Sequence, residues 1–317
     1  PSMLIDTACS SSMVAVIETC DALLTGKIDI AIAGGIRINN LPIAFHETNI
    51  GVESSDCFTR TFDGQADGAG DGEGAGFLML KRLEDAIQDQ DYIYAVIDGY
   101  AINTESQGAS LTAPTVQGKK KVILDAWKNA SVLPEDIGYI ELHGTGTRLG
   151  DGIEYTALQE AFHEKTEKIG FCAVGSVKSN FGHLHEAAGV LSLIKCIFML
   201  NQKVIPKSLH FTVPNTTMGW VDSALYISTR TKKWEIQKRR IIGVNSFGLS
   251  GTNCHMVLGE FHENEDSSPA KDLLDSGCLF QEKRCWYTDY IEQKELPAYQ
   301  YMWKKKNVVE REKSHYS

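Results

Sequence analysis

Residues 139–147 have the sequence YIELHGTGT, a short apolar segment followed by a histidine and by alternating glycines and threonines. The segment 139–142 predicts a strand, and open α/β sheets place their functional groups at strand ends. The glycines allow a ligand to approach the backbone, and the hydroxyls of Thr145 and Thr147 can bond a polar ligand. His143 is therefore a candidate functional residue, with a capping histidine in a tight turn as the open alternative.

A second histidine follows the next predicted strand, at residues 174–177. His183 lies just before a predicted helix, 186–200, which is apolar on nearly all sides and is therefore expected to be buried. Near a helix N-terminus the helix dipole keeps an imidazole neutral, so that it can donate a hydrogen bond to an oxyanion. Lys178 falls between this strand and this helix, and we expect it to be buried and to hold the network electrostatically.

Cys9 precedes three serines that start a predicted helix, with apolar residues at helical spacing from Met13 to Leu24. The positive end of a helix and its free N–H groups favour a thiolate, which makes Cys9 a candidate nucleophile. A small buried core cysteine is the alternative. That alternative is kept for the other cysteines: Cys20, Cys57, Cys172, Cys196, Cys254, Cys278 and Cys285.

Residues 245–253, NSFGLSGTN, form a predicted turn between strands at 241–244 and 255–258. N–H groups exposed in such a turn suit an oxyanion hole, and a plain hairpin is the alternative. The glycine cluster at 68–76 precedes a strand instead of following one and lacks the Gly-Lys-Ser/Thr of a phosphate-binding loop, which excludes a nucleotide site. No set of histidine, cysteine and carboxylate has metal-ligand spacing in the sequence, so no metal site is predicted.

The remaining periodicity predicts alternating strands and helices and hence a layered α/β fold. Asp151 and Glu154, three residues apart, predict a capping box that starts a helix through Phe162. His185 and His210 are expected to be structural. Further predicted elements are a helix at 119–129, a buried strand at 28–33 that ends at Gly34-Gly35, and strands at 77–80 and 92–97.

The composition is that of a folded, acidic protein: of 317 residues 43% are hydrophobic and 23% are charged, and the net charge is -10. These values exclude a disordered chain and a small disulfide scaffold, and the negative charge argues against nucleic-acid binding. No long uncharged apolar run could span a membrane, and the N-terminus lacks the layout of a signal peptide. We therefore expect a cytoplasmic protein with reduced thiols and with no membrane or nucleic-acid partner.

Taken in order, Cys9, His143, Lys178, His183 and the turn at Gly248 resemble the β-ketoacyl synthase (ketosynthase) domain of modular type I polyketide synthases, in the thiolase-like superfamily. The resemblance covers residues 1 to about 260. The matching stretches are residues 6–11, 62–63 with 67–68, 72–76, 143–147, 150–151, 178–183 and 245–253.

The resemblance implies an α/β fold with five layers, α-β-α-β-α, built from two similar halves. Relatives have a long segment before the cysteine motif, so we expect the first half to be incomplete and the chain to be a piece of a longer polypeptide. The implied divisions are residues 1–100 for the rest of the N-terminal half, 101–260 for the C-terminal half, and 261–317 for a linker that wraps the core.

The resemblance also implies the chemistry. Cys9 matches the nucleophile that accepts an acyl chain from the phosphopantetheine thioester of an acyl carrier protein. His143 and His183 match the pair that decarboxylates a malonyl-type extender and stabilises the enolate, which then attacks the Cys9 thioester in a Claisen condensation. Lys178 matches the lysine that organises these histidines, and the N–H groups of Cys9 and Leu249 match the thioester oxyanion hole.

Other implied roles concern binding and support. Thr145 and Thr147 match positions that contact the pantetheine arm, and a structural loop is matched by Asn245, Phe247, Gly248 and Gly251. No cofactor is expected to be bound, because the phosphopantetheine arrives on the carrier protein. The implied partners are this carrier, the other domains of a polyketide synthase, and a second copy of the chain in a homodimer.

The sequence departs from the family pattern at several positions. The stretch 69–71, which ends in Asp71, replaces a more usual aromatic-Val-Arg, and His185-Glu186 replaces the usual Glu-Ala. Leu249-Ser250 stands where many relatives have Phe-Gly, and the first of these residues gates the acyl pocket. The Leu-Ser variant resembles ketosynthases of assembly lines that lack built-in acyltransferases.

Two other functions are open from the sequence alone. One is a non-condensing module that docks acyl chains or carrier proteins. The other is a fatty-acid-type β-ketoacyl synthase, which uses the same chemistry. A thiolase is disfavoured by the Gly-Thr-Gly-Thr at 144–147 together with Lys-Ser-Asn-Phe-Gly-His at 178–183.

Overall fold

The structure is a computed structural model that describes residues 1–39, 52–105, 114–236 and 238–262. Its helices are α1 (Ser11–Leu24), α2 (Leu83–Gln88), α3 (Val116–Asn129), α4 (Arg148–His163), α5 (Lys178–Phe181) and α6 (Ala188–Gln202). Its strands are β1 (Ile30–Arg37), β2 (Gly74–Lys81), β3 (Val96–Thr104), β4 (Ile137–Glu141), β5 (Cys172–Gly175), β6 (Val204–Ile205), β7 (Leu225–Ile227), β8 (Lys232–Lys233), β9 (Ile241–Phe247) and β10 (Thr252–Gly259). Within these ranges, no helix combines the length and the apolar character that crossing a membrane requires.

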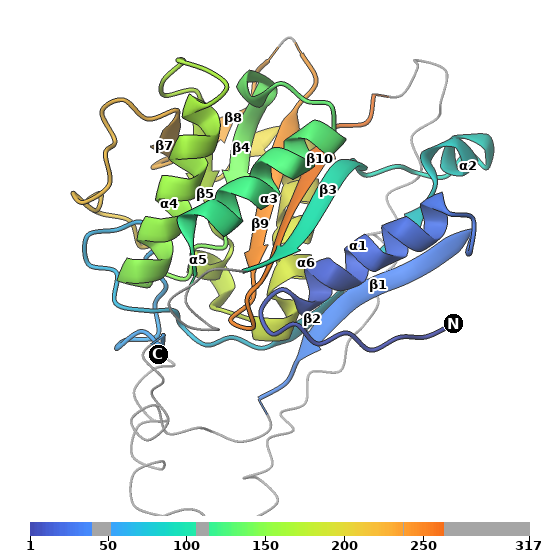
Figure 1. Ribbon diagram of the computed structural model, residues 1–317, viewed down its shortest axis with the longest axis horizontal. Coiled ribbons are helices and arrows are strands. Elements are labelled where there is room, and N and C mark those ends of the chain that lie inside the picture. Colours follow the sequence, from blue (N-terminus) through green and yellow to red (C-terminus); the bar gives the residue numbers. More distant parts are fainter. Residues whose placement is uncertain (40–51, 106–113, 237, 263–317) are drawn as a thin grey trace, which may run out of the picture. The chain divides into compact units, whose positions relative to one another are not determined.

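The larger sheet has six strands in the order β3-β10-β9-β4-β5-β7 (Figure 1). β10 pairs antiparallel with both of its neighbours, β3 and β9. The pairs β9–β4, β4–β5 and β5–β7 are parallel. Because parallel strands end at the same edge of a sheet, the residues that follow β4 and β5 are brought close together.

Both faces of this sheet are covered, because its strands alternate apolar side chains between two cores. On one face Ile140 of β4 and Val257 of β10 pack with apolar residues of α3 and α4, and Figure 1 shows these two helices over that face. On the other face Tyr139 and Met256, their neighbours in sequence, pack with residues of α1 and α6. A single sheet therefore separates two helical layers.

The smaller sheet is the antiparallel pair β1–β2, in which Ile32 lies opposite Met79. One of its faces packs on the layer of α1 and α6, through Ala33 and its partner Leu78. The other face is open, since Ile32 and Met79 are 68% and 69% exposed. The predicted buried strand at 28–33 is thus wrong in its burial: only one side of β1 is covered. The described residues form four layers, α-β-α-β.

Two other predictions differ in extent. The strand predicted at 92–97 is β3, which begins only at Val96, because its hydrogen-bonding partner β10 ends at Gly259. The helix predicted to be buried on nearly all sides, α6, leaves Phe198 51% exposed. The remaining predicted helices and strands are present, with ends moved by a few residues. The predicted linker, 261–317, lies outside the described residues beyond its first two positions.

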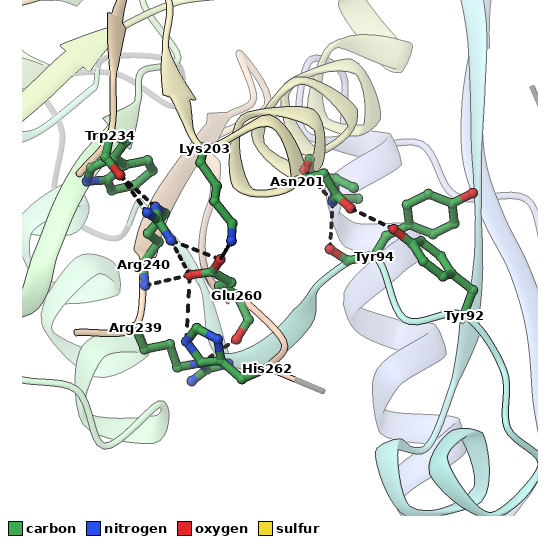
Figure 2. Close-up of polar contacts among 10 residues, drawn as sticks. Tyr92, Tyr94, Asn201, Lys203, Trp234, Arg239, Arg240, Glu260 and His262 are labelled. Carbon is green, nitrogen blue, oxygen red and sulfur yellow. Dashed lines mark hydrogen bonds and ion pairs between the residues drawn. The ribbon is translucent and has the colours of Figure 1, made fainter. Parts of the chain in front are cut away.

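A buried ion pair closes the larger sheet where β9 begins and β10 ends (Figure 2). Arg240 contacts the two carboxylate oxygens of Glu260 at 2.9 and 2.8 Å, and it donates to the Trp234 carbonyl at 2.6 Å. Lys203, at the end of α6, and His262 lie 3.8 and 3.7 Å from the same carboxylate. The side chains of Arg240 and Glu260 are only 10% and 7% exposed, so this pair is part of the interior.

Candidate active site

Cys9 lies in a tight loop directly before α1, whose first helical residue is Ser11. Ala8 has a φ of 55°, in the left-handed region, which costs a residue with a side chain about 1–3 kcal/mol. The loop is held by the Ser11 hydroxyl, which accepts the Thr7 N–H at 2.9 Å and donates to the Ala8 carbonyl at 2.6 Å. Cys9 therefore sits at a helix start, as the sequence predicts, and it is partly exposed.

The turn between β9 and β10 packs against this loop. The Ser250 hydroxyl donates to the Thr7 carbonyl at 3.0 Å. A Cβ at Gly248 would collide with the same carbonyl, so only glycine fits there. Among the described residues, the Cys9 and Leu249 N–H groups donate no hydrogen bond, which leaves both available to a ligand oxygen.

His143 follows β4 and His183 follows β5 and α5, and their rings meet edge to face with centroids 5.6 Å apart. The Phe247 N–H lies 3.3 Å from His143 Nδ1, and the His185 N–H lies 3.1 Å from His183 Nδ1. A backbone N–H can only donate, so both Nδ1 atoms accept. Each neutral ring therefore carries its proton on Nε2, where it is a donor for a ligand.

Burial lowers the pKa of both imidazoles well below its usual value, and the Lys178 cation adds to the effect at each ring. For His183 the neighbouring His185 and Arg37 lower the pKa further. Both rings are thus neutral at physiological pH. The sequence attributes the neutral state of His183 to the dipole of the following helix. That helix, α6, begins only at Ala188, and the lowered pKa instead comes from burial and nearby cations.

Lys178 is the first residue of α5 and is 2% exposed, so the prediction that it is buried is confirmed. Burial lowers the pKa of its amine, whereas the charges of Glu141 and Glu154, followed by Cys9, raise it. A buried amine at this position opposes protonation of both imidazoles, as their lowered pKa values indicate.

Two buried carboxylates inside α4 hold the loop that carries His143. Glu154 accepts the N–H groups of His143 and Gly144, both at 2.8 Å. Asp151 accepts the Gly146 N–H at 3.0 Å. Burial raises the pKa of both carboxyls, that of Asp151 to about 8. The sequence reveals these residues only as helix-start signals and not as supports of the site.

The predicted capping box is wrong, because the N-cap of α4 is Thr147. Its hydroxyl accepts the Gly150 N–H at 3.2 Å and lies 3.1 Å from the Thr145 hydroxyl. Asp151 is therefore already inside the helix. The predicted contact of Thr145 and Thr147 with a pantetheine arm stays a prediction.

A chain of buried hydrogen bonds extends this support to the core. The Asn245 side chain donates to Glu154 at 2.8 Å and lies 2.6 Å from His255 Nδ1. The Trp127 indole donates to His255 Nε2 at 3.1 Å, which fixes the imidazole proton on Nδ1. Burial lowers the pKa of His255 to about 3. The position of His255 within an apolar strand pattern is the signal that could have revealed these hydrogen bonds.

Phe247, predicted to be part of a structural loop, donates its N–H to His143. Its ring also contacts a buried cation, the amine of Lys119. The Lys119 amine lies 3.9 Å from the centroid of that ring and 4.0 Å from a Glu105 carboxylate oxygen. At the end of the turn Gly251 has a φ of 88° and donates to the Gly248 carbonyl at 2.9 Å. These contacts fix the loop in place, and Lys119 is a further support that the sequence did not reveal.

His185 lies in the site, although the sequence suggests a structural role. Its Nε2 is 3.0 Å from Asp71 Oδ1, and its ring stacks on His183 with centroids 4.5 Å apart. The Cys9 sulfur and a ring nitrogen from each of His183 and His185 lie within 4.8 Å of one another. Spacing along the chain cannot reveal this group, because Cys9 is remote from both histidines in sequence. His210 packs instead on Phe58.

A cysteine at a helix start and two neutral histidines that follow strands thus lie together in a layered α/β fold. The family models described as Beta-ketoacyl synthase, N-terminal domain and C-terminal domain match residues 1–86 and 94–212. A third model, Ketoacyl-synthetase C-terminal extension, matches residues 214–281. The chain belongs to the β-ketoacyl synthase family.

Among curated relatives, Polyketide synthase PksL of Bacillus subtilis is 43% identical over 264 residues, which cover 82% of this chain and 6% of the relative. The PKS-NRPS hybrid synthetase ATPKS of Aspergillus niger is 41% identical over 267 residues, 82% of this chain and 14% of the relative. The chain therefore spans a small part of these long proteins.

A solved structure of the ketosynthase from module 6 of the bacillaene synthase of Bacillus subtilis is similar throughout the matched region. The TM-score is 0.79 at 43% identity, over 82% of this chain and 47% of the solved one. The chain thus spans about half the length of that ketosynthase. The predicted thiolase-like α/β fold is confirmed.

Proposed function

We propose that this chain is the ketosynthase part of a polyketide synthase, which takes an acyl chain onto Cys9 and condenses it with a malonyl-type extender. The observation that carries the proposal is the pair of neutral imidazoles, His143 and His183, each with an Nε2–H donor and with Nδ1 already engaged. His183 lies within 4.8 Å of the Cys9 sulfur, where an enolate must form if it is to attack a Cys9 thioester.

In the loading step the Cys9 thiolate attacks the carbonyl carbon of a carrier-bound thioester, and the pantetheine thiol leaves. The developing oxyanion needs donors that are already in place. The N–H groups of Cys9 and Leu249, which have no partner among the described residues, suit this role. In other enzymes one such donor contributes about 10²–10³ in rate.

In the condensation step the extender loses its carboxylate as CO₂, and the bonding electrons move to the thioester oxygen as an enolate. The two Nε2–H groups of His143 and His183 donate to that oxygen. The enolate carbon then attacks the acyl group on Cys9, a C–C bond forms, and Cys9 leaves as the thiolate. Lys178 favours this chemistry because it keeps both rings neutral and therefore able to donate without losing a proton.

The extender and the acyl chain are proposed to arrive on an acyl carrier protein, with Thr145 and Thr147 along the pantetheine arm and with no cofactor resident in the site. A homodimer and the other domains of a polyketide synthase are the proposed partners. The alternative, a module that docks carriers without condensing, needs neither Nε2–H donor, and a fatty-acid-type synthase differs only in the acyl chain accepted.

The test is the intact mass of the full chain after incubation with a short acyl-pantetheine thioester. We expect an acyl-sized gain in wild type and none in Cys9→Ala, because only the thiolate can accept the acyl group. His183→Ala should still load but should form no β-keto product when a malonyl thioester follows. Loading of Cys9→Ala would refute the nucleophile assignment, and no loading of a cooperatively folded wild type would favour the docking module.

A further inference from the structure

His185 and Asp71 form a polar pair that the condensation chemistry does not use. The His185 Nε2 to Asp71 Oδ1 distance is 3.0 Å, and the two side chains are 30% and 27% exposed. The two residues lie 114 positions apart in sequence and meet in this contact.

Backbone hydrogen bonds hold Asp71 and His185 close to Cys9. The Gly72 N–H donates to the His183 carbonyl at 3.1 Å, and the His183 N–H donates to the Gly70 carbonyl at 2.7 Å, so the segment with Asp71 is fastened alongside His183. His185 itself has a φ of 41°, in the left-handed region, so its orientation is imposed by its surroundings. The result is a ring stacked on His183 and within 4.8 Å of the Cys9 sulfur.

We propose that Cys9, His185 and Asp71 act as a Cys–His–Asp triad, in which His185 is a catalytic residue of acyl loading and Asp71 positions it. This inference rests on the proposed function for the acyl step, but not for the reactivity of the thiol itself.

The step balances in protons and electrons. His185 takes the Cys9 thiol proton and pairs as imidazolium with the thiolate. The thiolate attacks the thioester carbonyl, the new C–S bond forms, and the bond to the donor thiolate breaks. That leaving thiolate takes the proton from His185, which leaves an acylated Cys9, a free thiol and a neutral imidazole.

The charges around His185 support this role. Hydrogen bonds to Asp71 and to Cys9 raise the pKa of His185 to about 9, against burial and the Arg37 cation. Arg37 is itself paired with Glu186 at 3.3 Å. The neighbouring His183 is neutral. His185 therefore differs from the other two site histidines, which stay neutral while His185 is poised to carry the proton.

The experiment measures how fast iodoacetamide alkylates Cys9 in the full chain between pH 5.5 and 9.5, with peptide mapping to separate it from the exposed Cys57. All buffers contain EDTA. We expect the ratio of the rate at pH 6.5 to that at pH 9 to fall about tenfold in His185→Gln. Asp71→Asn should fall between this variant and wild type, and His210→Gln, which removes an exposed histidine elsewhere, should leave the ratio unchanged.

A charge-exchanged variant, Asp71→Arg with His185→Glu, separates pairing from catalysis. It keeps two opposite charges at these positions but has no imidazole, so we expect normal thermal unfolding and the alkylation profile of His185→Gln. A wild-type profile in this variant would refute the triad and leave a structural pair. It also keeps the test informative if His185→Gln fails to fold.

The outcomes distinguish the triad from the proposed function. Alkylation needs no acyl donor, so a profile that depends on His185 in a chain that takes no acyl group would refute the ketosynthase proposal alone. Unchanged acyl loading in His185→Gln would refute the triad alone. An alkylation profile that changes when zinc replaces EDTA would show that Cys9, His183 and His185 bind a metal instead, and it would also overturn the triad.

Discussion

The two main sheets of this protein are built from similar apolar strands but are covered differently. The six-stranded sheet has helices on both faces, and its strands β9 and β10 are buried nearly throughout. The β1–β2 sheet is covered on one face only, and Ile32 and Met79 lie open on the other. Similar apolar strands are therefore buried on both faces in one sheet and on one face in the other, because the elements that pack against the two sheets differ.

The candidate site draws on both regions, and its supports differ accordingly. His143 is held from the covered sheet, through Glu154, Asn245 and β9. Cys9 lies in a short loop closed by a bond from Thr7 to Ser11, and Asp71 and His185 bond to each other from two further loops. We therefore expect substitutions in the covered sheet to act through stability and those in the loops to act through reactivity.

A large loss of stability is expected at Arg240, which is buried against Glu260. Removing it in Arg240→Ala leaves a buried carboxylate without its main partner, and breaking such a pair costs about 3–5 kcal/mol. Arg82, at the end of β2, bonds Asp29 and Asp85 at 2.6 Å each, but its side chain is 28% exposed. Arg82→Ala is the control and should lose less in the free energy of unfolding by urea. Equal losses would contradict the difference between the sheets.

A smaller loss is expected at Glu154, which accepts three hydrogen bonds inside the site. Glu154→Gln keeps the shape but turns an N–H toward a backbone donor, so a buried donor loses its acceptor at about 1–3 kcal/mol. The measurement is the free energy of unfolding together with condensation activity, which should fall because the His143 loop loosens. Glu160→Gln, at a partly exposed position on the same helix, is the matched control. Full activity in Glu154→Gln would show that the loop holds without this carboxylate.

The helices, the strands and the α/β class follow from local patterns, because apolar periodicity and strand-end glycines report on neighbours in sequence, whereas the thiolase-like fold follows from the family resemblance. Most helices and strands were predicted on this basis, and so were the positions of Cys9, His143 and His183. What the sequence hides is burial and long-range pairing. The open face of β1 depends on what covers it, and the roles of Glu154 and His185 depend on partners far away in the chain. Asp71 and His185 appear in the sequence as two unrelated departures and are explained only by their contact.

The smallest effect is expected on the open face of β1, where neighbouring residues face opposite ways. Ile32 is 68% exposed and Ala33 is 5% exposed. Ile32→Lys should change the free energy of unfolding by no more than about 0.5 kcal/mol, since its side chain already meets water. It should also reduce self-association in sedimentation velocity, because an exposed apolar patch favours contact between molecules. Ala33→Lys puts a charge into the core against α1 and should unfold the chain, because a buried charge without a partner is costly. If Ile32→Lys destabilised as strongly as Ala33→Lys, this face would be covered in solution and the contrast between the two sheets would not hold.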